Sequence, residues 1–248
     1  MTISIITVVY NNNETILDAI QSVLSQKNVE IEYIVIDGGS TDGTVELIKK
    51  NSDQISVFIS EPDLGIYDAM NKGIGLAKGD VIGILNSDDV YANSNVLNDV
   101  CLSFRNYPET EILYGDLIYV KKDDINKKVR SWKSMPYYKN FFEKGNVPPH
   151  PTLFVRSHIY QQAGVFDIKY KLAADYEFML RIFKKYDFKA KYVDQLMVKM
   201  RLGGATNKSI SNILNGNKEI VAAWKKNGLK PPLFLMPLRF FKRLAQFF

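Results

Sequence analysis

The feature that most constrains the fold is a regular alternation of apolar and amphipathic segments in the first hundred residues. Four short runs, ISIITVV, IEYIVID, ISVFIS and DVIGILN, are mostly apolar and rich in β-branched residues. Segments with helical periodicity separate them, and the first, ETILDAIQSVLSQ, places Ile16, Ile20 and Val23 on one face. Strands that are apolar on both faces lie buried in parallel sheets, so the pattern predicts right-handed β-α-β units.

Polar loops follow all four of these predicted strands. Their sequences are YNNN, DGGSTDGT, EPDLG and NSDD. Because ligands bind beyond the carboxyl ends of the strands in such sheets, we expect these loops to share one ligand site. Asn, Asp, Ser and Gly are also ordinary turn and helix-cap residues, which would explain any single loop. Four such loops at one edge favour the ligand site.

The pattern changes from Val100 onward. EILYGDLIYV and KVRSWK flank KKDDINK as in an antiparallel hairpin, PTLFVRS and AKYVDQLMVKM have strand patterns, and DYEFMLRIFKKY has a helical one. Helical segments near residues 210–226 and 233–247 follow, and the sequence KKNGLKPP is predicted to link them. We predict an α/β fold with one domain, 1–205, and basic amphipathic helices, 206–248. Within the domain, 1–99 form a Rossmann-like nucleotide-binding half with a mostly parallel sheet, and 100–205 a smaller mixed α+β half.

Composition limits the class of protein. The chain has 248 residues, 46% of them hydrophobic and 24% charged, which is enough for a sizeable core. The single cysteine, Cys101, excludes an internal disulfide and suits a reducing compartment. The start, MTISIITVVYNN, lacks the features of a signal peptide, and no apolar run is long enough to cross a bilayer. We therefore expect a cytoplasmic enzyme whose membrane contact is peripheral.

The positive charge is concentrated in the C-terminal segment. The whole chain carries a net charge of +5, but residues 206–248 carry eight Lys or Arg against Glu219 alone, which leaves the first 205 residues slightly negative. In PPLFLMPLRFFKRLAQFF, Leu, Phe and Met are mixed with Arg239, Lys242 and Arg243, which suits a segment lying on an anionic membrane. An ordinary closing helix packed on the core is the alternative. A nucleic-acid binder is disfavoured, because the charge lies beside apolar residues.

Four segments together carry a family resemblance: SIITVVYNNNETILDAIQSVLSQ, EYIVIDGGSTDGT, EPDLGIYDAMNKGIGLAKGDVIGILNSDD and AADYEFMLR. In this order and spacing they resemble the family 2, A-type, inverting glycosyltransferases. The resemblance is closest to the bacterial branch that builds capsule, exopolysaccharide or O-antigen repeat units. It covers roughly the first 200 residues and implies a nucleotide-sugar donor.

The resemblance assigns the nucleotide to the ends of the first two strands. Thr7, Val9 and Tyr10 would line the base and ribose. Asp37 would accept a hydrogen bond from a pyrimidine N3–H, and because a carboxylate only accepts hydrogen bonds it suits uracil, thymine or the N1–H of guanine. A UDP-sugar is the first expectation. Asp42, in GGSTDGT, matches a family aspartate, but a tight turn and helix cap explain it better.

The segment EPDLGIYDAMNKGI would close one wall of the donor site. Asp63 would contact the donor. Asp68 and Asn71 fall at positions i and i+3 of one helical face, where both would reach the nucleotide. Lys72 would reach a phosphate, although a solvent-exposed lysine is the default interpretation.

The NSDD loop corresponds to the family's metal and diphosphate motif, which usually has two carboxylates separated by one residue. Here Asn86 takes the first position, followed by Ser87, and both are assigned to the nucleotide site. The lost charge leaves Asp88 as the main metal ligand, with Asp89 supporting it or contacting sugar hydroxyls. The implied cofactor is Mn²⁺ or Mg²⁺. Alternatively, the two aspartates merely cap a helix beginning near Ser94.

The resemblance places the catalytic base in AADYEF, which makes it Asp175. The family typically has Glu-Asp here, and Ala174 replaces the Glu. The positive end of the helix dipole favours the ionised form of a carboxylate at a helix start. The same position would also suit an aspartate that only caps the helix or stabilises its first turn. His150, in VPPHPT, is an acceptor-side candidate. Arg201, in KMRLGGAT, would approach the diphosphate from a loop made mobile by its glycines.

The implied reaction is a hexosyl transfer by single displacement. Asp175 would take the proton of an acceptor hydroxyl as its oxygen attacks the anomeric carbon. If the C-terminal segment contacts membrane, the acceptor is a glycan on a polyprenyl diphosphate lipid at the cytosolic face.

Two other functions are compatible with part of the sequence. A nucleotidyltransferase should have a Gly-rich, Arg-containing loop after the first strand, which YNNNET is not. A sugar-nucleotide-binding or membrane scaffold protein without catalysis stays open because of Asn86 and Ala174. The presence of Asp37, Asp88 and Asp175 counts against it.

Overall fold

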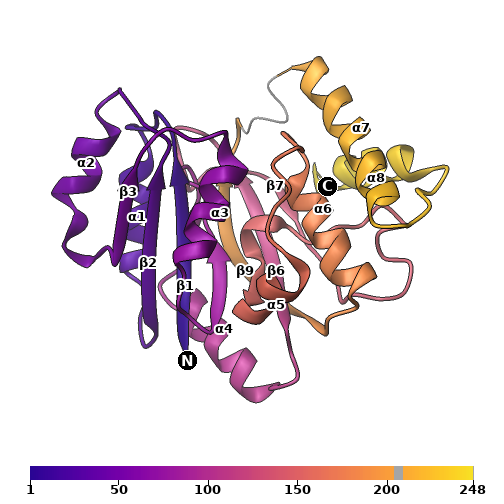
Figure 1. The fold of residues 1–248 in the computed structure, drawn as a ribbon, viewed down its shortest axis with the longest axis horizontal. Helices are drawn as coiled ribbons and strands as arrows, with labels where there is room; N and C mark the ends of the chain where they lie inside the picture. Colours follow the sequence, from indigo (N-terminus) through magenta and orange to yellow (C-terminus); the bar gives the residue numbers. More distant parts are fainter. Residues whose placement is uncertain (204–208, 248) are drawn as a thin grey trace.

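The computed structural model describes residues 1–203 and 209–247, which form a nine-stranded sheet with helices on both faces (Figure 1). The predicted boundary at 205 lies outside the described residues. The first four strands are parallel, as the sequence predicted, and follow the order β3-β2-β1-β4. Their bounds are β1 (Thr2–Val9), β2 (Glu30–Asp37), β3 (Val57–Ser60) and β4 (Val81–Ile84).

The second half extends the same sheet with mixed strand directions. The order continues from β4 through β8, β6 and β9 to β5, and β7 pairs with β6. The predicted hairpin is confirmed as the antiparallel pair β6 and β7, whereas β6 and β9 run parallel. The bounds are β5 (Val90–Tyr91), β6 (Ile112–Val120), β7 (Lys128–Trp132), β8 (Phe154–Arg156) and β9 (Ala190–Arg201).

Helices cover the sheet on two sides and define two apolar clusters. Ile16, Ile20 and Val100, from α1 and α4, belong to one cluster, and Met70 and Ile159, from α3 and α5, belong to the other. The bounds are α1 (Ile16–Leu24), α2 (Thr44–Lys50), α3 (Ile66–Leu76), α4 (Val96–Asn106) and α5 (Ser157–Ala163), with 3₁₀ turns at Ser52–Gln54 and His150–Thr152. Apolar helix faces packed on both sides explain why the central strands are apolar at nearly every position.

Helix α6 (Ala174–Leu180) is anchored by a buried ionic network and continues into a π-helical turn, Arg181–Lys185. The fully buried Glu177 carboxylate accepts hydrogen bonds from Nε of Arg181 at 3.2 Å and from Nη2 at 2.9 Å. Asn227 donates to the same carboxylate at 3.0 Å. Arg181 in turn donates to the carbonyl oxygens of Ala163 and Val165. This network fixes α6, and therefore the residues of its first turn.

The C-terminal helices α7 (Ile210–Lys226) and α8 (Leu235–Leu244) lie beside α6 (Figure 1). Trp224 of α7 is 1% exposed and donates to the Tyr176 hydroxyl at 2.9 Å. Leu235 of α8 is buried in the core, whereas Phe240 and Phe241 are 60% and 64% exposed. One face of α8 is therefore packed and the other is exposed. Within residues 1–203 and 209–247, no helix has the length and hydropathy needed to span a bilayer.

Gly145 sets how closely α8 approaches the preceding loop. Its φ is +76°, and an added Cβ would lie 3.0 Å from the Arg239 nitrogen and the Leu238 carbonyl carbon. Gly228 has a similar φ of +72° but open space around it. Left-handed backbone costs a non-glycine residue about 1–2 kcal/mol, so Gly228→Ala should lose that much unfolding free energy. We expect Gly145→Ala to lose about 1 kcal/mol more, measured by denaturant unfolding, because α8 must shift. Equal losses would show that α8 is not closely packed there.

Candidate active site

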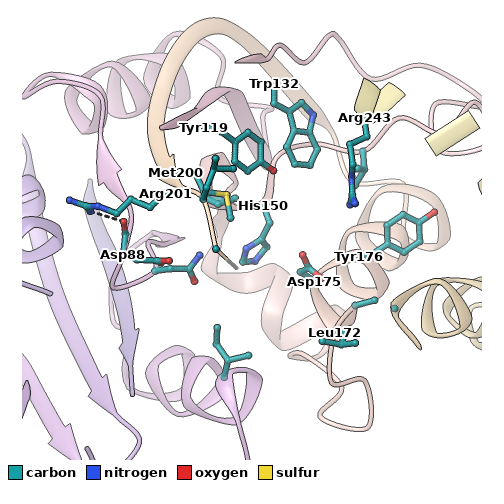
Figure 2. Close-up of a pocket in the computed structure, with 18 of the residues that line it drawn as sticks. Asp88, Tyr119, Trp132, His150, Leu172, Asp175, Tyr176, Met200, Arg201 and Arg243 are labelled. Atoms are coloured by element: carbon teal, nitrogen blue, oxygen red, sulfur yellow. Dashed lines mark hydrogen bonds between the residues drawn. The ribbon is translucent and has the colours of Figure 1, made fainter. Parts of the chain in front are cut away.

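Loops from the ends of β1, β2, β3 and β4 line one cavity of about 1790 Å³, together with residues of α6, β7 and α8 (Figure 2). The edge of the sheet at which the sequence predicts a ligand site therefore lines a cavity. Among the described residues, its lining includes nine basic side chains and three aspartates: Lys122, Lys128, Arg130, Lys133, Lys171, Arg201, Arg239, Lys242 and Arg243, with Asp63, Asp88 and Asp175. This excess of positive charge favours an anionic ligand.

The end of the cavity near β1 is lined by an aromatic side chain and glycine main chain. Tyr10 is 64% exposed and lines the cavity together with Val9, Gly39 and Asp63. A Cβ added to Gly38 would lie 2.4 Å from Oδ2 of Asp63, so the glycine allows this carboxylate to approach the main chain. Asp63 also accepts a hydrogen bond from the Gly65 N–H at 2.8 Å. The structure thus brings Val9, Tyr10 and Asp63 to the cavity, as predicted.

Thr7 and Asp37 lie below this surface, outside the cavity lining. The Thr7 side chain is buried and its hydroxyl accepts a hydrogen bond from Tyr33 at 3.1 Å, so the structure does not place it in the cavity, and its contact with the nucleotide stays a prediction. Asp37 is fully buried and accepts hydrogen bonds from the Gly39 and Ser40 N–H groups and from the hydroxyls of Ser40 and Ser60. Asp37 therefore shapes the loop that lines the cavity, and its contact with a base stays a prediction.

Asp68, Asn71 and Lys72 do not line the cavity, which corrects their predicted placement. Asp68 accepts a hydrogen bond from the Leu64 N–H at the start of α3. Asn71 exchanges two hydrogen bonds with the main chain of Phe166. Lys72 forms ion pairs with Glu61 at 2.8 Å and Asp68 at 3.7 Å. These three residues belong to the packing and surface of α3. Asp42 likewise has a structural role, accepting hydrogen bonds from Asn13 and Thr44.

The NSDD loop is the turn between β4 and β5, and Asp88 faces the cavity (Figure 2). Helix α4 begins only at Val96, so neither aspartate caps it. Asp89 is fully buried, and burial together with the Asp88 charge raises its pKa well above the usual range. It accepts hydrogen bonds from the Asn86 amide at 3.1 Å and the Arg201 N–H at 3.2 Å. These bonds hold Asp89 inside the turn behind Asp88, and its predicted part in supporting the metal ligand or contacting a sugar hydroxyl stays a prediction.

Asn86 and Ser87 are held in place by the loop after β1. Asn12 donates to the Ser87 hydroxyl at 2.9 Å, and the Thr15 hydroxyl donates to the Ser87 carbonyl oxygen at 3.1 Å. Oδ1 of Asn86 is buried and has no hydrogen-bond partner in the described part of the chain. A buried amide oxygen without a hydrogen-bond partner is energetically unfavourable. This atom is therefore a candidate to bind a cation or to accept a hydrogen bond from a bound substrate.

Arg201 is not in a loop, which corrects its predicted setting. It is the last residue of β9, is 5% exposed and donates to the carbonyl oxygens of Asp88 at 2.7 Å and Lys122 at 3.1 Å (Figure 2). Its guanidinium also pairs with Asp18 of α1. Arg201 therefore braces the Asp88 turn from behind. The second glycine of the predicted mobile loop, Gly204, lies outside the described residues.

Asp175 lies in the first turn of α6 and faces the cavity (Figure 2). Its Oδ1 accepts a hydrogen bond from the Tyr67 hydroxyl at 3.1 Å. Burial, and then the Asp175 charge, raises the pKa of Tyr67 well above its usual value, so the hydroxyl remains a donor. His150 lines the same cavity, and burial lowers its pKa despite the opposing Asp175 charge. The imidazole is therefore neutral near pH 7.

Glu219 of α7 fixes the chain immediately before Asp175. Its carboxylate accepts hydrogen bonds from the N–H groups of Lys171 at 3.0 Å, Leu172 at 2.8 Å and Ala173 at 2.9 Å. Charge-assisted bonds to three successive main-chain donors hold the start of α6 rigidly. Sequence reasoning missed Glu219 and Tyr67, and no local spacing signals either contact.

The chain has relatives of known class. The family described as Glycosyl transferase family 2 matches residues 4–160. An uncharacterized glycosyltransferase of Mycobacterium tuberculosis is 32% identical over 182 residues, which cover 73% of this chain and 68% of that protein. A PGL/p-HBAD biosynthesis glycosyltransferase of Mycobacterium bovis is 25% identical over 192 residues, which cover 76% and 72%.

Solved structures share the fold at low sequence identity. S. aureus TarS 1–349 in complex with UDP-GlcNAc has a TM-score of 0.70 at 15% identity, covering 99% of this chain and 73% of that one. The mannosyltransferase PcManGT from Pyrobaculum calidifontis, in complex with GDP-Man and Mn²⁺, has a TM-score of 0.67 at 15% identity, covering 98% and 70%. The α/β fold with its mostly parallel sheet, the cavity and the sequence matches define a glycosyltransferase. The chain belongs to glycosyltransferase family 2.

Proposed function

We propose that the protein is an inverting enzyme that transfers a sugar from a nucleotide-diphosphate sugar, first of all a UDP-sugar, to a hydroxyl of a glycan acceptor. The observation that carries this proposal is that Asp88 and Asp175 line the same cavity, one at the end of β4 and the other in the first turn of α6 (Figure 2). The nucleoside would lie against Tyr10 and Gly39, and the diphosphate would lie near Asp88. Both TarS with UDP-GlcNAc and PcManGT with GDP-Man support a donor of this class.

Asp88 and Oδ1 of Asn86 would hold a divalent cation. Mg²⁺ and Mn²⁺ prefer hard oxygen ligands and are commonly held by one or two protein groups plus substrate phosphates, which fits a carboxylate beside an unpartnered amide oxygen. The described residues contain no cluster of three or more His, Cys, Asp or Glu that would hold the ion alone. When bound, the cation would neutralise charge on the departing diphosphate. PcManGT binds Mn²⁺, which supports this choice.

Asp175 would act as the general base. The Tyr67 hydroxyl donates to Oδ1 at 3.1 Å, which would leave Oδ2 to accept the proton of an incoming hydroxyl. As the acceptor oxygen forms its bond to the anomeric carbon, the bond from that carbon to the diphosphate oxygen breaks and Asp175 takes the hydroxyl proton. Attack from the side opposite the leaving group inverts the anomeric configuration. His150, neutral in the same cavity, would face the acceptor.

The acceptor we propose is a glycan on a polyprenyl diphosphate lipid, in surface polysaccharide synthesis at the inner face of the cell membrane. The exposed apolar side chains of α8 and the residues after it, Leu238, Phe240, Phe241 and Phe247, are interspersed with Lys242 and Arg243. Exposed apolar side chains together with basic ones suit the interface of an anionic membrane. Phe240 and Phe247 also line the cavity, so the same face would bring a lipid-linked acceptor to Asp175.

The donor site is tested by the release of nucleoside diphosphate from UDP-, dTDP- and GDP-sugars, with an oligosaccharide or lipid-linked acceptor present. We expect turnover of one donor class in Mn²⁺ or Mg²⁺, and a loss of at least about tenfold with EDTA or in Asp88→Asn, because both remove cation binding. Asp124→Asn, in the exposed turn between β6 and β7 and outside the cavity, should keep full activity. Full activity of Asp88→Asn in EDTA would refute the metal site. Donor binding without turnover would favour a catalytically impaired binding protein.

A further inference from the structure

Three arginines gather at the end of the cavity away from Asp88. Arg130 comes from β7, and Arg239 and Arg243 come from α8. Figure 2 shows Arg243 and the neighbouring Trp132 across the cavity from Asp88, with Asp175 between them in this view. We call Arg130, Arg239 and Arg243 the arginine triad. Neither the donor site nor the catalytic base uses it.

Arg130 is a buried cation with incomplete hydrogen bonding. It is 6% exposed, and its guanidinium lies 3.7 Å from the centre of the Tyr119 ring and 5.3 Å from that of Phe247. Nη1 donates to Gln246 at 2.8 Å, whereas Nε is buried without a hydrogen-bond partner in the described part of the chain. A buried charge with an unpartnered donor is unfavourable, which indicates a ligand that accepts hydrogen bonds there.

Arg239 and Arg243 add two like charges beside it. They lie at positions i and i+4, on the same face of α8. The Arg239 guanidinium lies 4.7 Å from the centre of the Tyr176 ring. Burial, and the nearby Arg243 charge, lower the pKa values of both Arg130 and Arg239. Among residues 1–203 and 209–247, no carboxylate forms an ion pair with Arg130 or with Arg239.

We propose that the arginine triad binds the phosphate or diphosphate group of the acceptor. This inference rests on the proposed function, because the donor diphosphate is assigned to Asp88 at the other end of the cavity. Guanidinium groups bind phosphate oxygens through paired N–H donors, and such a ligand would complete the bonding of Nε of Arg130. The Asp175 charge also acts on Arg239, and the substrate phosphate would supply the further negative charge that two neighbouring arginines need.

The position of the triad also limits the size of the acceptor. Arg239 stacks on Tyr176, the residue next to Asp175, so the anion and the base act on adjacent parts of the acceptor. The reacting hydroxyl must therefore lie close to the phosphate, as it does when the glycan is short. On the other side, Phe240 and Phe247 are exposed and line the cavity, which gives an apolar chain attached to the phosphate a path out.

The test compares farnesyl diphosphate with farnesol, by calorimetry on the full chain with saturating UDP or GDP and Mn²⁺ to fill the donor end. The variants are Arg239→Gln and the more exposed Arg243→Gln, which is expected to fold normally. Arg105→Gln, an exposed arginine of α4 outside the cavity, is the matched control. We expect both triad variants to bind farnesyl diphosphate at least about tenfold more weakly, the control to bind it normally, and farnesol to bind weakly to all.

Other outcomes would overturn the proposal. In the first, the native chain fails to bind farnesyl diphosphate, and in the second, the triad variants bind it as tightly as the native chain does. In the third, farnesol binds as tightly as farnesyl diphosphate. A membrane role for the arginines gives a separate signature: the variants would lose binding to phosphatidylglycerol vesicles but keep farnesyl diphosphate. A failure of the proposed function would give a different result. The native chain would then bind no nucleotide, while its triad-dependent binding of farnesyl diphosphate would persist.

Discussion

Asp175→Asn should abolish sugar transfer while leaving donor binding and folding intact. The side chain lines the cavity in the first turn of α6, and Tyr67 orients it through a 3.1 Å hydrogen bond. An amide of the same shape cannot accept the acceptor's proton, and the loss of a general base slows reactions by about 10²- to 10⁴-fold. The measurement is the initial rate of transfer at saturating donor, with the donor dissociation constant determined separately.

Asp124→Asn provides the control for this substitution. Asp124 lies in the exposed turn between β6 and β7, outside the cavity, and its substitution by Asn removes the same negative charge. It should retain the native rate. If Asp175→Asn kept more than a tenth of the native rate, or if it lost donor affinity in parallel with rate, Asp175 would not be the base.

Glu177→Ala should cause the largest loss of stability of any substitution near the site. The carboxylate is fully buried and is bonded to Arg181 and Asn227, with Lys226 at 3.4 Å. Its removal would leave the Arg181 charge buried, and breaking a buried ion pair on one side costs about 3–5 kcal/mol. Unfolding in urea, followed by tryptophan fluorescence, measures the change, since Trp224 packs beside this helix.

An exposed ion pair gives the comparison. Glu14 pairs with Lys122 at 2.7 Å, but both side chains are about two-thirds exposed. Glu14→Ala should therefore change the free energy of unfolding far less than Glu177→Ala does. Similar losses in the two variants would show that the α6 network is not the anchor that the structure indicates.

The fold was largely predictable because its signals are local. Short apolar runs rich in β-branched residues gave the four parallel strands, and two strand patterns around a polar segment gave the β6–β7 hairpin. The polar loops gave the ligand edge of the sheet, because parallel strands end together. The two-residue strand β5 had no comparable signal, since it forms only by pairing with β9.

The errors concern which way side chains point. Asp68, Asn71 and Lys72 do share part of a helix surface, but tertiary packing decided that this surface meets Glu61 and the Phe166 segment instead of the cavity. Thr7 lies within β1, whose two faces are both covered by apolar clusters, so only the residues at the end of the strand reach the cavity. Sequence spacing identifies a shared face, and only packing shows what the face contacts.

The unpredicted site residues depend on contacts between distant parts of the chain. Glu219 binds main-chain groups more than forty residues earlier, and Tyr67 meets Asp175 across 108 positions. Arg130 joins Arg239 and Arg243 only because the C-terminal helix folds back over the cavity. The charge of the C-terminal segment was visible in the sequence, but its position next to Asp175 was not.

The most direct test of the account is a crystal structure of the protein with Mn²⁺ and the nucleoside diphosphate that binds it, UDP or GDP. We predict that the nucleoside lies beside Tyr10 and Gly39, and that the diphosphate lies with the metal at Asp88 and Asn86. The arginine triad should hold no part of the nucleotide. A diphosphate bound between Arg130 and Arg239, with the nucleoside away from Tyr10, would contradict the assignment of the two ends of the cavity.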